Sequence, residues 1–389
     1  MLQNESNLLK DNGYFSACLK LPCFCLKVQY QLTTEFYLRG MSEHIIIVGG
    51  GLSGLSLAWY LTKKNKTVTI LEATTRLGGR IETIAGKTGT PLELGATWFS
   101  DMHSKLKELI DELGLDTFPQ FSGGISLFQT KSFEPPQQFF ITAAEQPSYR
   151  IAGGTYKLIE ALLNKLKGQT IITDNAVTKI DAGQYPINIT TNNGEVYTGD
   201  KVVLCMPPQL IGDQINILPK LSGELSSLLS TVHTWMAGSV KFVLEYNHPF
   251  WRNSGYSGML FSHAGIVTEM YDHTNFEENK FGFTGFLNGG AAGYEYSIRK
   301  QLVLEQLSGL LGNKAMEPLS YNDKIWSDKF TITSPQVIRY PHQHNGHELL
   351  QSGYMDGRLF FGGSETSSNC PGYMEGAVVA AHRVATNIN

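Results

Sequence analysis

The stretch that decides the fold is His44-Ile45-Ile46-Ile47-Val48-Gly49-Gly50-Gly51-Leu52-Ser53-Gly54. Its first five residues form a short β-branched run, which predicts a buried parallel strand. The glycines predict a tight turn, and residues 55–64 predict a helix. A second apolar run, Thr67–Leu71, predicts another strand and ends at Glu72. This order of strand, glycine turn, helix, strand and acid is typical of a dinucleotide-binding unit.

Each residue type in this unit has a physical role. Gly49 makes the tight turn, Gly51 lets the backbone approach a pyrophosphate, and Gly54 lets the helix pack on the strand. The phosphates then meet free N–H groups at the start of the helix. Glu72 follows Gly54 at about the expected spacing of roughly 20 residues, so its carboxylate is predicted to accept hydrogen bonds from a ribose without a 2′-phosphate.

The composition indicates a globular protein that binds a ligand closely along its backbone. Of 389 residues, 40 are glycine, and 42% are hydrophobic. Glycine exceeds its average of roughly 7% without the period of collagen, and the apolar content excludes a disordered chain. The net charge is −4 and no basic run occurs, so we expect no nucleic-acid partner. No apolar run approaches the ~20 residues of a transmembrane helix, so we expect no transmembrane segment.

The first forty residues differ from the rest of the chain. They show no clear period, and Met41 stands directly before the first strand signal. We expect residues 1–40 to be a disordered or non-native extension. Three of the five cysteines lie there, and the other two, Cys205 and Cys370, are isolated. Such a set forms no disulfide framework, which favours a reducing compartment and predicts a cytoplasmic protein.

The residues after Glu72 identify a family. They run Ala73-Thr74-Thr75-Arg76-Leu77-Gly78-Gly79-Arg80, where the glycine pair brings backbone close to a ligand and Arg80 is placed as a cation for phosphate. With the fingerprint, this stretch resembles the flavin-containing amine oxidase superfamily, which includes monoamine and polyamine oxidases. Further matching segments follow in order: residues 92–98 (LELGATW), 151–155 (IAGGT), 175–177 (NAV), 357–365 (GRLFFGGSE) and 371–377 (PGYMEGA).

The resemblance implies a noncovalently bound FAD and assigns residues to it. The adenine is expected at the backbone of Val177, the ribityl and phosphate groups at Gly363 and Glu365, and the flavin ring at Tyr373 and Met374. The complete set of expected FAD-binding residues is Gly49, Gly51, Leu52, Ser53, Gly54, Glu72, Ala73, Gly79, Arg80, Gly95, Ala96, Thr97, Trp98, Val177, Gly363, Glu365, Gly372, Tyr373, Met374 and Ala377.

Two further residues are expected at the reaction centre through the same resemblance. Lys241, in the alternating run 237–246, is expected to hold a water against the flavin N5 and to assist reoxidation by oxygen. Tyr373 is expected to form one wall of an aromatic slot that guides a neutral amine to the flavin. The opposite wall falls near Gln336, which is not aromatic, and Pro335 stands where some members carry a flavin-attaching cysteine.

The histidines at positions 342, 344 and 347 fit the spacing of no regular metal site, so we expect a solvated loop and no metal.

The expected fold class is α/β: a doubly wound Rossmann-type FAD-binding domain with an inserted mixed-sheet and helix substrate domain. The FAD-binding domain is assigned to residues 41–98, 150–230 and 335–389, and the substrate domain to residues 99–149 and 231–334.

The expected activity is amine oxidation at FAD. A hydride passes from the carbon beside an amine nitrogen to the flavin, the imine hydrolyses, and O2 reoxidises the flavin to give H2O2. The expected partners are a small amine and O2, and a homodimer is possible. Two alternatives stay open: a desaturase or protoporphyrinogen oxidase-like enzyme acting on C–C bonds, and a non-catalytic, flavin-stabilised interaction protein. Function sits in the site and not in the fold, so the motifs alone do not separate the three.

Overall fold

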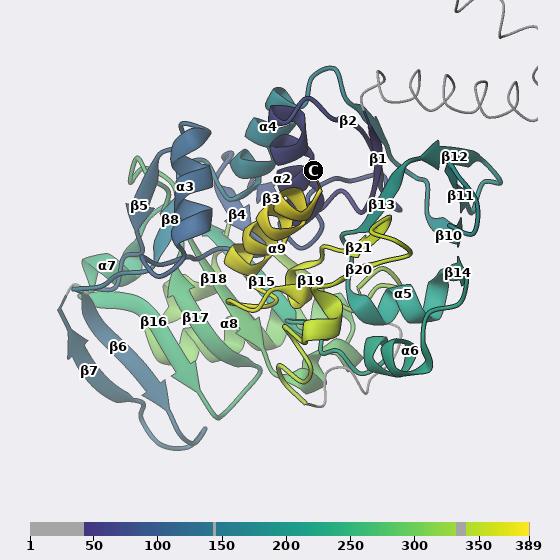
Figure 1. The fold of residues 1–389 in the computed structure, drawn as a ribbon. Helices are drawn as coiled ribbons and strands as arrows, with labels where there is room; N and C mark the ends of the chain where they lie inside the picture. Colours follow the sequence, from purple (N-terminus) through teal and green to yellow (C-terminus); the bar gives the residue numbers. More distant parts are fainter. Residues whose placement is uncertain (1–42, 143–144, 332–339, 389) are drawn as a thin grey trace, which may run out of the picture. The chain divides into compact units, whose positions relative to one another are not determined.

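The predicted first strand, β1 (His44–Val48), lies inside a six-stranded sheet with the order β20-β21-β13-β1-β2-β9 (Figure 1). The computed structural model describes residues 43–142, 145–331 and 340–388. The expectations for residues 1–40, Pro335 and Gln336 therefore lie outside the described residues.

The six-stranded sheet is parallel except at one edge. Its other strands are β2 (Thr67–Leu71), β9 (Thr170–Ile172), β13 (Lys201–Leu204), β21 (Leu359–Phe361) and the antiparallel edge strand β20 (Gly353–Tyr354). The neighbours of β1 are β2 on one side and β13 on the other. The direction of winding thus reverses at β1, and ligands of open α/β sheets bind beyond the carboxyl ends of strands at such a point.

Both faces of this sheet are covered, which confirms the expected α/β class. One face packs against α2 (Leu52–Lys63), α3 (Ser104–Glu112), α4 (Tyr156–Lys165) and α9 (Met374–Asn387). The other packs against α5 (Pro208–Gln214), α6 (Gly223–Leu229) and a four-stranded sheet of β10 (Val177–Asp181), β11 (Ile187–Thr191), β12 (Val196–Gly199) and β14 (Asn216–Leu218). Helix α2 begins at Leu52, three residues before the predicted start, because the helical conformation starts directly after the glycine turn.

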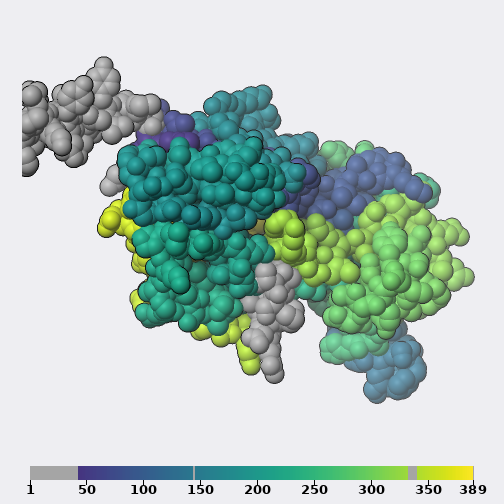
Figure 2. All heavy atoms as spheres, turned by 90° about the vertical axis from the view of Figure 1, so that its right-hand side faces the viewer, coloured from purple at the N-terminus to yellow at the C-terminus, as the bar shows by residue number. Residues whose placement is uncertain are grey.

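A second, seven-stranded mixed sheet has the order β19-β15-β18-β17-β16-β6-β7. Its strands are β6 (Gly124–Gln129), β7 (Gln137–Ile141), β15 (Val240–Tyr246), β16 (Tyr256–Ser262), β17 (Val267–Asp272), β18 (Phe281–Leu287) and β19 (Ser320–Ile325). Helix α8 (Tyr296–Leu311) packs on one face, and the short α7 (Phe250–Asn253) lies between β15 and β16 in sequence. Figure 2 shows the four-stranded sheet with α5 and α6 (teal) and parts of the seven-stranded sheet (green) as separate regions of one surface.

The two large sheets draw on different segments of the chain. All strands of the seven-stranded sheet lie within the segments assigned above to the substrate domain, and all strands of the six-stranded sheet lie within those assigned to the FAD-binding domain. Helix α3 is an exception, because it lies in the segment 99–149 but packs against α9. The division into two domains stays a prediction. No helix within the described ranges is long and apolar enough to cross a bilayer.

Strand β15 is buried along its whole length and links the two parts of the structure. It begins at Val240, later than the predicted run, which started at residue 237. One face of the strand joins the aromatic core beneath α8. On its other face, Val243 packs with Leu92 and Leu94 around the end of β4 (Pro91–Glu93). Strand β4 forms a hairpin with β3 (Thr83–Ala85), while β5 (Thr117–Pro119) pairs with β8 (Tyr149–Ile151).

The carboxylate of Glu245 fixes this hairpin on β15. It accepts hydrogen bonds from the backbone N–H groups of Lys87 (2.6 Å) and Thr88 (3.0 Å) and from the hydroxyls of Thr88 and Thr90 (both 2.6 Å). Burial alone would raise the pKa of Glu245, but these hydrogen bonds lower it to about 2. Gly86 leaves room for the carboxylate, because a Cβ there would lie 2.5 Å from it.

We expect Glu245→Gln to destabilise the fold, because an amide nitrogen would face the hydrogen-bond donors. The folded-state pKa of about 2 lies below the ordinary 4.5, so ionised Glu245 stabilises the fold above about pH 4.5 and this contribution is lost as the pH falls toward about 2. The free energy of unfolding in urea should fall by about 3 kcal/mol at neutral pH, and the deficit should shrink in acid. Glu108→Gln, on the exposed surface of α3, serves as the control. An equal deficit at neutral and acid pH would contradict this account of Glu245.

Candidate functional site

A cavity of about 1000 Å³ begins at the carboxyl end of β1 and reaches the face of the seven-stranded sheet. Its walls come from segments that lie far apart in the sequence. All of the predicted FAD-binding residues except Gly54 line this cavity, and so does Lys241. The structure thus brings the sequence motifs together around one space that is large enough for a dinucleotide.

The three fingerprint glycines meet different steric demands. Gly49 has a φ of +108°, and a Cβ there would lie 2.5 Å from the carbonyl oxygen of Cys205. A Cβ at Gly54 would lie 2.0 Å from the carbonyl oxygen of Gly49, so Gly54 permits α2 to pack against the turn. A Cβ at Gly51 would lie 3.8 Å from the nearest atom, the Cα of Gly79. Gly51 is therefore not required by packing, and its side-chain space belongs to the cavity.

Two helices begin at the cavity without a side-chain cap. Neither N-cap residue, Gly51 of α2 or Tyr373 of α9, caps its helix through a side chain. The first residues of both helices, Leu52 and Met374 among them, line the cavity. Such helix starts carry a partial positive charge and bind phosphate groups, so the site fits an anionic dinucleotide. The hydroxyl of Ser53 donates to the carbonyl of Gly362 and so joins α2 to the residue that follows β21.

The carboxylate of Glu72 is held at the glycine turn. Its Oε2 accepts the N–H of Gly50 (2.7 Å), and its Oε1 accepts the N–H (2.9 Å) and the hydroxyl (2.8 Å) of Thr74. Carboxylate oxygens accept more than one hydrogen bond, so these contacts orient Glu72 and leave it able to accept a hydroxyl from a bound ribose.

Arg80 and Glu365 form a two-point ion pair inside the cavity. Nη1 of Arg80 lies 2.7 Å from Oε1 of Glu365, and Nη2 lies 3.0 Å from Oε2. Arg80 also donates to the hydroxyl of Ser364 and to the carbonyl of Trp235. Burial would raise the pKa of Glu365, but the charge and hydrogen bonds of Arg80 keep it below its ordinary value. The sequence predicts Arg80 as a phosphate cation, and the structure adds a buried carboxylate that compensates its charge.

The ammonium group of Lys241 is buried at the other end of the cavity. Nζ donates to the carbonyl oxygen of Gly95 (2.6 Å) and to the hydroxyl of Thr97, and it lies 5.0 Å from the ring centre of Trp98. Burial lowers the pKa of Lys241 to about 7, although the nearby carboxylate of Glu93 opposes this shift. The carboxylate of Glu269 on β17 acts in the same direction as Glu93 on the pKa of Lys241 and favours its charged form.

Residues on four neighbouring strands continue the cavity floor from Lys241. The strand register places Lys324 of β19 opposite Lys241, Phe286 of β18 on its other side, and Glu269 of β17 opposite Phe286. All four side chains line the cavity. The sequence analysis missed Lys324, Phe286 and Glu269. Lys324 stands two residues before a tryptophan, Trp326, and no sequence motif marks Phe286 or Glu269.

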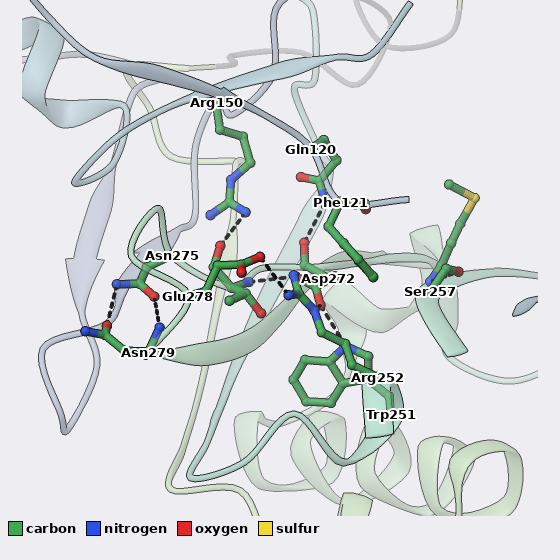
Figure 3. Close-up of polar contacts among 12 residues, drawn as sticks. Gln120, Phe121, Arg150, Trp251, Arg252, Ser257, Asp272, Asn275, Glu278 and Asn279 are labelled. Carbon is green, nitrogen blue, oxygen red and sulfur yellow. Dashed lines mark hydrogen bonds and ion pairs between the residues drawn. The ribbon is translucent and has the colours of Figure 1, made fainter. Parts of the chain in front are cut away.

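A partly buried hydrogen-bond network fixes the ring of Trp98. Its Nε1 donates to Oε1 of Gln120 (2.8 Å), and Nε2 of Gln120 donates to the carbonyl of Asp272 (2.8 Å). The carboxylate of Asp272 in turn accepts hydrogen bonds from Arg252 and Trp251, as Figure 3 shows. The aromatic surface beneath the Lys241 ammonium is therefore anchored to β17 and α7.

The second predicted reaction-centre residue, Tyr373, lies beside an aromatic residue that the sequence analysis missed. The ring centres of Tyr373 and Trp235 are 5.1 Å apart, and Tyr373 is 38% exposed. Gly372 makes this packing possible, because a Cβ there would lie 2.5 Å from the Cβ of Trp235. The signal for Trp235 was an aromatic residue just ahead of the strand that carries Lys241.

Comparison with known proteins agrees with these observations. The family model described as "Flavin containing amine oxidoreductase" matches residues 52–128 and 118–389. A probable flavin-containing monoamine oxidase A of Dictyostelium discoideum is 26% identical, over 88% of this chain and 97% of that protein. Amine oxidase [flavin-containing] B of Homo sapiens is 23% identical, over 88% and 85%. A wild-type putrescine oxidase structure with bound putrescine has a TM-score of 0.76 at 20% identity, covering 90% of this chain and 99% of that one.

The chain belongs to the flavin-containing amine oxidoreductase family. This confirms the resemblance seen in the sequence, and the protein is a flavin-dependent oxidoreductase. The family implies a flavin cofactor, a small-molecule substrate and O2. The comparisons do not favour the desaturase-like or non-catalytic alternatives.

The glycines allow a paired test of the cofactor end of the cavity. We expect Gly51→Ala to leave the melting temperature of the flavin-free protein nearly unchanged but to weaken flavin binding by roughly 10-fold or more, because the methyl group occupies ligand space. Gly54→Ala should instead cost about 1–3 kcal/mol of stability, because its Cβ meets the Gly49 carbonyl. Circular dichroism melts and flavin fluorescence titrations measure the two effects. If Gly51→Ala unfolded the protein, or Gly54→Ala kept full stability, the assigned roles would be wrong.

Proposed function

We propose that the protein is an FAD-dependent amine oxidase that oxidises the C–N bond of a small amine. Bound FAD supplies the hydride acceptor and is the group that O2 reoxidises, with H2O2 as the product. The hydride leaves the carbon beside a neutral amine nitrogen, whose lone pair forms an iminium ion that loses a proton to give the imine. Water then hydrolyses the imine to a carbonyl compound and a released amine or ammonia.

The start of α2 and the glycine turn are proposed to hold the pyrophosphate, and Glu72 the adjacent ribose. Val177 is proposed to meet the adenine, and the segment around Gly363 the ribityl chain. Noncovalent binding is proposed because Pro335 stands where some members of the family carry a flavin-attaching cysteine. The cysteine that lines the cavity, Cys205, is also unsuited to a covalent link. Burial raises the pKa of Cys205 to about 12, and its carbonyl packs at the glycine turn. Such a thiol is a poor nucleophile.

Lys241 carries the functional proposal. A lysine buried in the cavity, fixed against the carbonyl of Gly95 and the ring of Trp98, is proposed to position a water and to assist reoxidation by O2. A cation placed there in advance stabilises negative charge that develops during that step. Tyr373, with Trp235 beside it, is proposed to guide the neutral amine toward the reacting centre.

A cytoplasmic location and a homodimer remain proposals.

Anaerobic mixing of the holoenzyme with amines, polyamines and amino acids tests the activity directly. We expect at least one amine to bleach the flavin absorbance, and air to restore it with formation of H2O2. Acid denaturation should release the flavin from the protein, because the cofactor is held without a covalent bond. A flavin that no amine bleaches would contradict the activity, and a flavin that stays with the denatured chain would contradict noncovalent binding.

Replacement of Lys241 separates its role in reoxidation from substrate oxidation. Lys241→Met keeps the volume of the buried chain and removes the cation. We expect the rate of flavin reoxidation by O2 to fall about 10²-fold, while anaerobic reduction by amine changes much less. Stopped-flow mixing of the reduced enzyme with O2 measures this, and Lys107→Met on the exposed surface of α3 is the control. Reoxidation at the wild-type rate in Lys241→Met would remove the proposed role.

A further inference from the structure

A buried carboxylate lies behind the cavity wall near Lys241. Glu93 ends β4 and is 2% exposed, whereas Gly95, two residues later, lines the cavity. The carbonyl oxygen of Gly95 is the acceptor for the Lys241 ammonium. The carbonyl oxygen of Glu93 accepts the hydroxyl of Thr284 on β18, the strand that pairs with β15. Glu93 is thus held against the sheet that carries Lys241, close to the backbone acceptor of this lysine.

Two hydrogen bonds fix the Glu93 carboxylate. Oε1 accepts the backbone N–H of Thr155 (2.5 Å), and Oε2 accepts the hydroxyl of Thr83 (2.9 Å). Both donors are uncharged. A side-chain amide at position 93 would keep both bonds, because its oxygen accepts from Thr155 and its nitrogen donates to the hydroxyl of Thr83. These contacts explain where Glu93 lies, but they do not require its negative charge.

The charge of Glu93 acts on Lys241. Burial raises the pKa of Glu93 and lowers that of Lys241, because each charged form loses hydration. The positive charge of Lys241 opposes the first change, and the carboxylate of Glu93 opposes the second. The interaction acts through space, since the ammonium itself donates to Gly95 and Thr97. Each of the two groups therefore favours the charged form of the other.

Other titratable groups around Lys241 act in both directions. Glu269 on β17 favours the ammonium less strongly than Glu93 does, and Arg150 on β8 disfavours it. Arg150 is buried and donates to a backbone carbonyl of the segment after β17 (2.9 Å; Figure 3). His273 lies beside Arg150, and burial holds the pKa of His273 well below its ordinary value. His273 is therefore neutral at pH 7.

The balance of these charges depends on Glu93. Lys324, the cross-strand neighbour of Lys241 on β19, already has a counter-ion in Glu82. Burial lowers the pKa of Arg150 to about 10, so this guanidinium stays charged at neutral pH. The carboxylate of Glu93 offsets the repulsion between Arg150 and the Lys241 ammonium. Without that offset the lysine would release its proton more readily.

We infer that Glu93 is a positioning residue for flavin reoxidation, because its carboxylate keeps the Lys241 side chain in the charged ammonium form near neutral pH. Glu93 acts through Lys241 from behind the cavity wall. A neutral lysine would not stabilise the negative charge that develops during reoxidation. The inference rests on the proposed role of Lys241 and adds the group that maintains its charge.

The test removes the charge of Glu93 and keeps its hydrogen bonds. We expect Glu93→Gln to lower the titration midpoint of Lys241 by about one pH unit, as for the loss of a nearby opposite charge. NMR of the oxidised holoenzyme with lysine isotope-labelled at Cε follows this titration, and the Lys241 resonance is the one missing in Lys241→Met. Glu269→Gln should lower the midpoint less than Glu93→Gln does. Glu160→Gln, on the exposed surface of α4, is the matched control and should leave the midpoint unchanged.

A reciprocal measurement uses the native Glu93. One interaction shifts both groups, so Lys241→Met should raise the midpoint at which the Glu93 carboxyl titrates. NMR of the holoenzyme with isotope-labelled glutamate measures this change. It tests the coupling of the two side chains even where Glu93→Gln folds poorly.

The pH dependence of reoxidation gives a kinetic readout. Holoenzyme reduced chemically, without an amine, is mixed with O2 at a series of pH values. A lysine is charged below its pKa, so the rate should be high in acid and fall as the pH rises through the wild-type midpoint of about 7. For a midpoint lower by about one pH unit, Glu93→Gln should be roughly 8-fold slower than the wild type at about pH 7.5 and nearly equal at about pH 5.5.

The outcomes separate this inference from the proposed activity. Unchanged midpoints of Lys241 in Glu93→Gln and of Glu93 in Lys241→Met overturn the inference and leave amine oxidation intact. A rate deficit of equal size at every pH also overturns it, because the loss would then be structural. Reoxidation at the wild-type rate in Lys241→Met removes the role of the lysine and the inference with it. A failure of amine oxidation shows separately, as a flavin that no amine bleaches, because none of these measurements uses an amine.

Discussion

The packing of one face of β15 against residues 86–97 is the constraint on which the site depends. Glu245 and Lys241 stand four residues apart on this face, and the same segment satisfies both. The carboxylate of Glu245 accepts hydrogen bonds from the backbone N–H groups of Lys87 and Thr88, and the ammonium of Lys241 donates one to the carbonyl oxygen of Gly95. The negative side chain thus binds backbone donors and the positive side chain binds a backbone acceptor of the same segment. Val243 packs between these two side chains on β15. These contacts therefore fix residues 94–97, which line the cavity, and the side chain of Lys241 relative to each other.

Much of the cavity wall around the glycine turn was predictable from the sequence, because its signals are local. The strand, glycine turn, helix and Glu72 follow one another within 29 residues of chain, from His44 to Glu72, and each has its own pattern. Gly54 is instructive, since it alone among the predicted residues does not line the cavity. Because Gly54 has no side chain, the carbonyl oxygen of Gly49 can pack directly against its Cα. The spacing of the motif also predicts this packing role.

The cavity floor around Lys241 was predictable only in part, because it depends on contacts between distant segments. Lys241 was found through its resemblance to a family motif, whereas Glu269 and Phe286 lie in alternating strands without any such motif. Their place beside Lys241 follows from the register of β15, β18 and β17, which the sequence of each strand does not specify. The same holds for Arg80 and Glu365, whose pairing spans 285 positions of the chain.

The cross-strand neighbours of Lys241 have a consequence for how the cavity floor of this protein responds to substitution. Positions 286 and 269 lie one and two strand spacings from Lys241 along the same cavity. Backbone hydrogen bonds fix the distance between neighbouring strands at about 4.8 Å. Side chains on the cavity floor are therefore separated from one another by multiples of this distance. A change of side-chain size or charge at one of these positions therefore alters one part of the cavity floor at a fixed distance from Lys241. The strand register and the hydrogen bonds of Lys241 need not change with it.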